Sequence, residues 1–406
     1  MSYPGPPVEF TKDRPLRLIV GSNDSGICAT SESQPELAVD GTVELHLAFA
    51  QEKQIERVTL TFSSWVLTRI RSGQHTFSDS ARPCRDVKLM LWRIGAAYPP
   101  PGEHVLRFPF SFSIPANAPP SMHEEGRHQA SIIYKLDLCG ERSVTFGFDV
   151  HIERRLNVIP PDLNIDRLRP RSGGDLIRVG RLDISRSVFK HGPSGHVDME
   201  LNIPGQNHRP FPIDTRHPFT VVVSTFSVPV YETSDPETDK DALCPSIDIA
   251  ALHLLLRVRL KRYTTLRVRG ALTTKQQNIR SHRLLSNFQD KDTLDVDIGP
   301  KEWVAYIGDD QKLSGKGHWK QQFVFRSSLI LSSQLATPTF KHALVDVNYA
   351  LKFECVIPSQ KSLVPDHCIT VKLPIVISSK TSSASSRRSA SSPLLADADV
   401  GRVYSG

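Results

Sequence analysis

Apolar and polar residues alternate with period two through most of the chain. The run PGEHVLRFPFSFSIPANAPPS at 101–121 places Phe108, Phe110, Phe112 and Ile114 on one side of a strand. Similar runs lie at 43–49, 58–62, 144–152, 219–223, 252–260, 345–353 and 369–377. Apart from a possible short turn at 245–252, no segment carries a capped stripe with helical spacing. The pattern predicts an all-β chain built from sandwiches.

Proline marks an edge in this pattern. Pro109 lies inside the strand at 108–114 but has no N–H to donate to a neighbouring strand. Proline within sheets is confined to edge strands or bulges, so we expect this strand at a sheet edge. Pro115, Pro119 and Pro120 then turn the chain towards the next sheet.

The 406 residues exceed what one hydrophobic core usually holds, so we expect two domains. The segment LNVIPPDLNIDRLRPRSGG at 156–174 joins a stiff Pro-Pro pair to a Gly-Gly pair, which is typical of a connector. The expected units are a flexible N-terminus at 1–7, an N-terminal sandwich at 8–155 and a C-terminal sandwich at 175–378. The Ser-rich tail at 379–406 is expected to be disordered.

Composition narrows the class of protein. No apolar run approaches the roughly 20 residues that cross a bilayer, and the N-terminus lacks a signal-peptide core, so a cytosolic location is expected. The six cysteines at 28, 84, 139, 244, 355 and 368 form no C-x-x-C pair, and we interpret them as reduced, without zinc or a disulfide framework. Catalytic, P-loop, dinucleotide and H-E-x-x-H motifs are absent, which predicts no enzyme, cofactor or metal.

Positive charge concentrates in LLLRVRLKRYTTLRVRG at 254–270. A strand over 254–262 would expose Arg257, Arg259 and Lys261 together, and a returning strand would add Arg267 and Arg269. Like charges side by side are unfavourable, so this face either is solvated and partly neutralised by the acidic segment at 232–241, or binds an acidic cargo or lipid headgroups. No aromatic residues accompany the arginines in a stacking pattern, which argues against nucleic acid.

Two blocks of the sequence resemble a known family. The first comprises Pro101–Glu103, Phe108–Phe112, Ile114–Pro115, Pro119–Ser121 and Ile133–Tyr134, and it resembles the N-terminal domain of the alpha-arrestins. The second comprises Ser328–Leu331, Thr337–Phe340 and Val347–Leu351, and it is similar to the closing strands of an arrestin C-terminal domain. The resemblance spans about 8–378.

This resemblance implies two immunoglobulin-like sandwiches and a non-enzymatic cytosolic adaptor in endocytosis, protein transport and signalling. Such adaptors bind cytoplasmic tails of transporters or receptors at the plasma membrane or endosomes, and they recruit a HECT-type ubiquitin ligase through PPxY or LPxY motifs for ubiquitin-dependent trafficking. This chain has neither motif, and its nearest WW-type string contains Pro229 and Tyr231. A structural sorting or coat subunit resembling retromer's arrestin-like component stays an alternative, and a sandwich transcription factor would need more basic residues than the Arg387–Arg388 pair supplies.

Two terminal segments suggest phosphate recognition. Lys12, Arg14 and Arg17 precede or begin the first strand, where phosphate-sensing arrestins carry basic residues. A solvated strand start is the simpler interpretation of these residues. In the tail, Arg388, Ser389, Ser391 and Pro393 form an R-S-x-S-x-P string that resembles a 14-3-3 docking site once Ser391 is phosphorylated. A Ser- and Arg-rich tail also produces such strings by chance.

Overall fold

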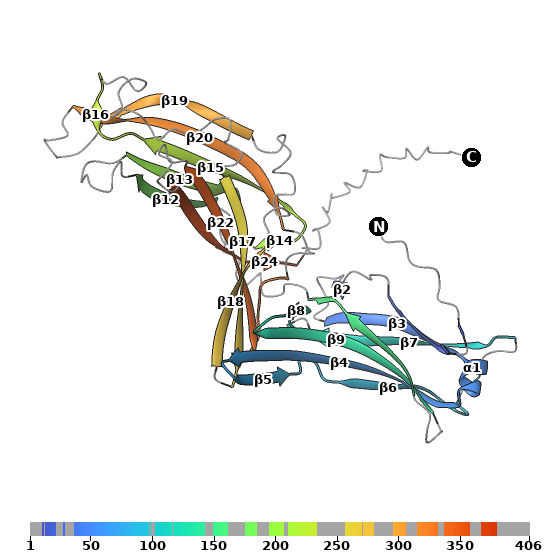
Figure 1. The fold of residues 1–406 in the computed structure, drawn as a ribbon. Coiled ribbons are helices and arrows are strands. Elements are labelled where there is room, and N and C mark those ends of the chain that lie inside the picture. Colours follow the sequence, from blue (N-terminus) through green and yellow to red (C-terminus); the bar gives the residue numbers. More distant parts are fainter. Residues whose placement is uncertain are drawn as a thin grey trace, which may run out of the picture.

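The computed structural model describes residues 10–379, with gaps that follow. The gaps are 12, 22–26, 29–35, 97, 99–101, 116, 143–148, 161–174, 185–194, 207–209, 234–255, 270, 280–294, 306–314, 332–336 and 358–366. The chain is an all-β sandwich protein, and its strands pair within two sets that share no strand (Figure 1). Among the described residues, no helix is long and apolar enough to cross a membrane.

The first set forms the N-terminal sandwich. Its elements are β1 (Leu16–Val20), β2 (Ile27–Cys28), β3 (Glu36–His46), α1 (Leu47–Glu52), β4 (Ile55–Ser72), β5 (His75–Ala81), β6 (Val87–Arg93), β7 (Val105–Pro115), β8 (Met122–Glu124), β9 (Gln129–Arg142), β10 (Val150–Leu156) and β11 (Val158–Ile159). One sheet has the order β1-β3-β7, and the other has the order β10-β9-β4-β5, with β6 on β4 and β8 on β9. The short strands β2 and β11 pair in parallel.

The second set forms the C-terminal sandwich. Its elements are β12 (Leu176–Ile184), β13 (Gly195–Ile203), β14 (Phe211–Pro212), β15 (Arg216–Phe226), β16 (Val230–Tyr231), β17 (Leu256–Val268), β18 (Ala271–Ile279), β19 (Asp295–Ala305), β20 (Lys316–Ile330), β21 (Phe340–Lys341), β22 (Val345–Ile357), β23 (His367–Ile375) and β24 (Ile377–Ser378). One sheet has the order β12-β13-β15-β20-β16 with β19 on β20, the other has β18-β17-β22-β21 with β23 on β22, and β14 pairs in parallel with β24.

Pro109 lies where its chemistry requires. Strand β7 pairs only with β3 among the described strands, so it is an edge strand, as the sequence predicts. Phe110, Phe112 and Ile114 are buried on its inner side, and Phe112 stacks on Phe62 of the opposite sheet with ring centroids 5.5 Å apart.

Two sequence-based boundaries differ from the structure. The alternation at 43–49 predicts a strand, but the chain turns into helix α1 at Leu47 because Leu47 and Ala50, three residues apart, are both buried. The expected connector at 156–174 overlaps the N-terminal sandwich, since β10 ends at Leu156 and β11 pairs with β2. Residues 161–174 of the connector and 380–406 of the expected disordered tail lie outside the described residues, as does the N-terminus at 1–7.

The two sandwiches repeat one strand plan. Strands β1, β2, β3, β4, β5, β7, β8, β9, β10 and β11 correspond in order to β13, β14, β15, β17, β18, β20, β21, β22, β23 and β24. Every pairing among the first ten, including the parallel one, recurs among the second ten with the same direction. The C-terminal sandwich adds β12, β16 and β19, and the N-terminal sandwich adds α1 and β6.

The repeat extends to single hydrogen bonds. The buried hydroxyl of Tyr134 on β9 donates to the carbonyl of Pro119 at 2.6 Å, and that of Tyr349 on β22 donates to the carbonyl of Thr337 at 2.7 Å. Ser121 follows Pro119 by two residues, and its hydroxyl accepts the backbone N–H at the start of β11 at 2.8 Å. Thr339 follows Thr337 by two residues, and its hydroxyl accepts the backbone N–H at the start of β24 at 2.8 Å. The blocks that carry the family resemblance therefore occupy equivalent places in the two sandwiches.

Candidate functional site

The predicted basic segment forms one long strand rather than a strand and its return. β17 runs from Leu256 to Val268, and its even-numbered positions face inward. All of them are buried except Arg262, which is charged and only partly buried. Arg257, Arg259, Lys261 and Arg267 all lie at odd positions of this one strand. The expected return of the chain after residue 262 is wrong, because the same strand continues to Val268.

Two of the predicted cations are paired with carboxylates on β22. Arg259 Nε lies 3.0 Å from Glu354 Oε2, and the same carboxylate receives Lys352 Nζ. Arg267 pairs with Asp346, whose hydrogen bond raises the pKa of the guanidinium. The like charges are therefore relieved from within the sheet, while residues 234–241 of the acidic segment lie outside the described part of the chain.

A net positive surface remains on the outer side of β17, β22 and β23. We call it the basic face, and it consists of Arg257, Arg259, Lys261, Lys352 and Lys372, with Glu354 as its one carboxylate. Lys372 on β23 lies opposite Lys352, which adds a cation that the sequence analysis did not assign. Within the described residues, neither Arg257 nor Lys261 makes an ion pair.

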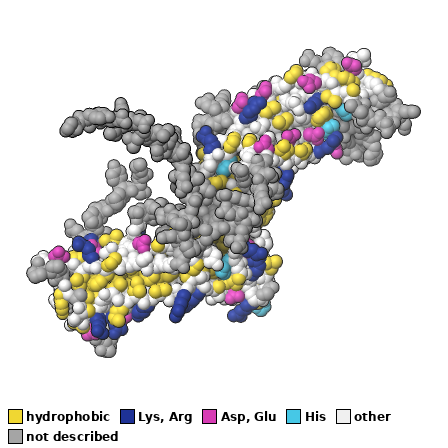
Figure 2. Space-filling model, turned by 180° about the vertical axis from the view of Figure 1, so that it is seen from behind, with side chains coloured by type: hydrophobic (Ala, Val, Ile, Leu, Met, Phe, Trp, Pro, Cys, Tyr) yellow, Lys and Arg dark blue, Asp and Glu magenta, His cyan; other side chains and the backbone are white. Residues whose placement is uncertain are grey.

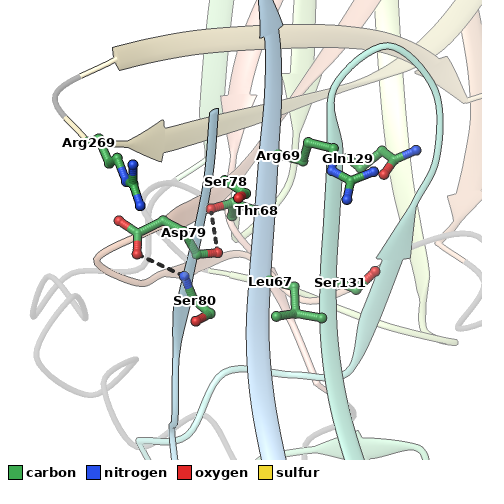
Figure 3. Close-up of a pocket in the computed structure, with 9 residues that line it drawn as sticks. All are labelled: Leu67, Thr68, Arg69, Ser78, Asp79, Ser80, Gln129, Ser131 and Arg269. Carbon is green, nitrogen blue, oxygen red and sulfur yellow. Dashed lines mark hydrogen bonds between the residues drawn. The ribbon is translucent and has the colours of Figure 1, made fainter. Parts of the chain in front are cut away.

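Arg269 lies away from this face. It follows β17 with a φ of 45° and lines an open polar cavity of about 520 Å³ with residues of β4, β5 and β9 (Figure 3). Figure 3 shows its side chain on the same side as Asp79 of β5, whose carboxylate accepts the N–H of Ser80 at 2.8 Å. The structure therefore separates Arg269 from the four other predicted cations and puts it at the junction of the sandwiches.

A buried carboxylate joins the two sandwiches at this junction. Glu124 of β8 is 5% exposed. Its Oε2 lies 3.3 Å from Arg262 Nη2 and accepts the hydroxyl of Thr264 at 2.7 Å, and its Oε1 lies 2.9 Å from Lys275 Nζ. Lys275 also donates to the carbonyl of Glu125 at 3.0 Å. Sequence reasoning missed this cluster, because its members are about 140 residues apart; the one signal was a charge at an inward position of β17.

The predicted phosphate-sensing residues are only partly available for an anion. Arg17 Nη1 lies 3.0 Å from the buried Glu44 carboxylate, which Arg107 Nε also meets at 3.1 Å. The Arg17 guanidinium further lies 4.3 Å from the centre of the Phe10 ring. Arg14 is exposed, and Lys12 lies outside the described residues.

The WW-type string is partly held in a sheet. Pro229 lies in a bend, Val230–Tyr231 form strand β16 against Gly317 and Lys316, and Lys316 Nζ lies 5.2 Å from the Tyr231 ring centre. The side chain of Tyr231 is reachable, since the residue is 55% exposed, but the backbone is not a free polyproline turn. Arg388, Ser389, Ser391 and Pro393 of the phosphorylation string lie outside the described residues.

Comparisons with known protein families and with curated proteins add no functional information to this geometry. No protein-family model matches the chain, and no curated protein gives a significant sequence match.

Proposed function

We propose that this protein is a non-enzymatic adaptor of the arrestin type that binds acidic or phosphorylated cytoplasmic segments of membrane proteins through the basic face. The observation that carries the proposal is the excess of five cations over one carboxylate in the basic face; the Arg267–Asp346 pair on the same strands adds no net charge. A rigid surface of this kind attracts an anionic partner at no cost in reorganising its backbone.

The spacing on β17 favours an extended partner. Arg257, Arg259 and Lys261 follow one another at intervals of two residues, so consecutive side chains leave the strand about 6.6–6.8 Å apart. A peptide in extended conformation presents alternate side chains at the same interval. Phosphoserine or Asp at every second position would therefore meet one cation each.

The wider partners follow from the resemblance and belong to the same proposal. They are tails of transporters or receptors, an anionic membrane surface, a HECT-type ubiquitin ligase reached without a PPxY motif, and a 14-3-3 protein on the phosphorylated tail. Proximity labelling in the native cell tests this set, and recovery of only metabolic enzymes or chromatin proteins would contradict it.

Charge reversal on the basic face tests the proposed site. We expect Arg257→Glu/Lys261→Glu/Lys372→Glu to weaken binding of a peptide with alternating phosphoserines at least tenfold at low salt, measured by fluorescence anisotropy. Binding to the unchanged protein should fall as salt rises, because exposed charges are screened. The variant should fold, since outward substitutions rarely cost much stability.

The matched control is Arg71→Glu/Arg85→Glu/Arg93→Glu, which makes the same change in net charge at exposed positions of the N-terminal sandwich. It should retain most of the affinity. Equal losses in both variants would reduce the effect to net charge, and unchanged binding in the first variant would remove the basic face from the function.

One observation favours the coat-subunit alternative. Figure 2 shows hydrophobic side chains gathered along the N-terminal sandwich, and Phe77, Val87, Met90 and Ile94 on or next to β5 and β6 are 39–64% exposed. A coat subunit would copurify with its partner at fixed stoichiometry, and Met90→Asp/Ile94→Asp would release it. An adaptor would instead copurify with its cargo at variable ratios.

A further inference from the structure

Three side chains with metal-ligating atoms converge on the outer side of the N-terminal sandwich. Cys139 on β9 lies directly opposite His151 on β10, and Asp149 immediately precedes β10. Cys139 Sγ is 3.7 Å from His151 Nε2 and 4.0 Å from Asp149 Oδ2, and all three ligand atoms lie within 4.8 Å of one another. The strand register therefore brings together residues that no sequence motif connects.

These separations are short enough for one cation to draw the three ligand atoms together. Zinc binds thiolate at about 2.3 Å, imidazole at about 2.0–2.1 Å and carboxylate at about 2.0–2.2 Å, which at tetrahedral angles puts sulfur about 3.5–3.7 Å from either other ligand atom. The sulfur–nitrogen distance is already near this value, and the sulfur–oxygen distance requires a small rotation of an exposed carboxylate. A thiolate with an imidazole favours zinc over magnesium or calcium, which prefer all-oxygen sites.

Neighbouring groups orient two of the three ligands, His151 and Asp149. Asp137 Oδ1 lies 3.5 Å from His151 Nδ1, on the ring nitrogen that does not face the sulfur. A metal-bound histidine usually donates its other ring N–H to such a carboxylate, and this hydrogen bond fixes the orientation of the ring. The second oxygen of Asp149 accepts the backbone N–H of Arg142 at 3.0 Å, so its Oδ2 is left facing Cys139.

The electrostatic surroundings of the sulfur also suit a cation. Three carboxylates, those of Asp149, Glu141 and Asp137, lie near enough to the Cys139 sulfur to act on it electrostatically. A divalent cation would offset these carboxylates and replace the thiol proton, so that binding releases a proton to solvent. His151 and Asp149 are exposed, so solvent can reach a cation bound between the three ligands. Three protein ligands leave the fourth tetrahedral position of such a cation to solvent.

The C-terminal sandwich provides an internal comparison. With Tyr134 aligned to Tyr349, the positions of Cys139, His151 and Asp149 correspond to Glu354, Thr370 and Cys368. There Glu354 is occupied by Arg259 and Lys352, so the shared strand plan does not itself create a ligand set.

We propose that Cys139, Asp149 and His151 form a zinc-binding site on the β9–β10 hairpin, with three protein ligands, Asp137 as a positioning residue and a fourth position open to water or an incoming ligand. The site lies on the other sandwich from the basic face and does not depend on the proposed adaptor function.

The test is metal titration of the full-length protein after treatment with a chelator. Zn²⁺ alone, in competition with a chromophoric chelator, should bind at one equivalent, and Co²⁺ should give a thiolate-to-cobalt charge-transfer band with tetrahedral ligand-field intensity. Cys139→Ser and His151→Gln should each weaken zinc at least 100-fold and abolish that band. Asp137→Asn should weaken zinc by about 10–100-fold and keep the band.

The matched control is Cys368→Ser, which removes an exposed thiol of the C-terminal sandwich, at the position that corresponds to Asp149, and should change nothing. Circular dichroism of the metal-free variants verifies that the fold is retained. Zinc affinity that Cys139→Ser leaves unchanged, a cobalt spectrum without the charge-transfer band, or no zinc binding at high micromolar metal would each overturn the proposal.

Discussion

Where the N-terminal sandwich has Ser64 on β4, the C-terminal sandwich has Arg262 on β17; the two lie opposite Tyr134 and Tyr349 respectively. Ser64 accepts the N–H of Cys84 at 3.0 Å and so holds a loop of its own sandwich. Arg262 instead meets Glu124 across the junction. The same position of the strand plan therefore holds a loop of its own sandwich in the N-terminal copy and contacts the other sandwich in the C-terminal copy.

Because Ser64 and Arg262 both lie at inward positions, the strand plan does not by itself determine which side chain an inward position carries or what that side chain contacts. Tyr134 and Tyr349 retain the same bond, although few residues around them are alike. The following predictions test how far the equivalence of the two sandwiches extends.

Removing the charge of Glu124 should have the largest effect. Glu124→Gln leaves Arg262 and Lys275 without their buried partner, and we expect a loss of about 2–3 kcal/mol in the free energy of unfolding, below the usual 3–5 because Lys275 is about a third exposed. Calorimetry should then show the sandwiches melting in two separated transitions. Glu125→Gln, at an exposed neighbour, is the control. One unchanged transition would mean that Glu124 does not couple the sandwiches.

The tyrosine bonds should contribute equally in the two copies. Tyr134→Phe and Tyr349→Phe each leave a carbonyl without its donor, and each should lower the free energy of unfolding by about 1–2 kcal/mol in denaturant titrations. Tyr98→Phe, which removes the hydroxyl of a tyrosine that is 62% exposed, serves as the control. A difference of more than about 1 kcal/mol between the two tyrosine variants would break the equivalence.

Acid should weaken the C-terminal sandwich by a smaller amount. Burial lowers the pKa of His217. The ring of His217 makes hydrogen bonds with the side-chain amide of Gln206 at Nδ1 and with the carbonyl of Pro212 at Nε2. The unfolded chain therefore binds the proton more readily, so stability is present above about pH 6.5 and is lost as the pH falls below it, by at most about 1.4 kcal/mol per unit. In thermal melts from pH 7.5 to 5.5, His217→Gln should flatten part of this slope. An identical slope in the variant would exclude His217 as its source.

The sequence predicted the strands and the edge position of β7 well, since period-two alternation and the missing N–H of Pro109 act locally. It predicted the basic residues but not their partners, because Glu354 and Asp346 reach Arg259 and Arg267 only through strand pairing. The repeated strand plan is not evident in the sequence, because the side chains that the two sandwiches share are few and differently spaced, as from Ser121 to Tyr134 and from Thr339 to Tyr349.

The cluster at Cys139 could not be predicted from spacing alone. Its members become neighbours only when the register of the β9–β10 hairpin puts Cys139 opposite His151. The absence of a C-x-x-C motif excluded the common zinc patterns, but it does not exclude a site assembled across two strands.

The two short parallel pairs determine how each sandwich would bear a mechanical load. β11 runs beside β2, and β24 beside β14, each in the same direction as its partner. Tension that acts on the N-terminal end of one strand of a parallel pair and on the C-terminal end of the other pulls the two strands in opposite directions along their own axes, so their hydrogen bonds break together instead of one after another. The bonds from Ser121 and Thr339 to the start of these last strands share that load. In single-molecule pulling, each sandwich should therefore yield in one sharp step, and Thr339→Val should lower the force of only one of the two steps.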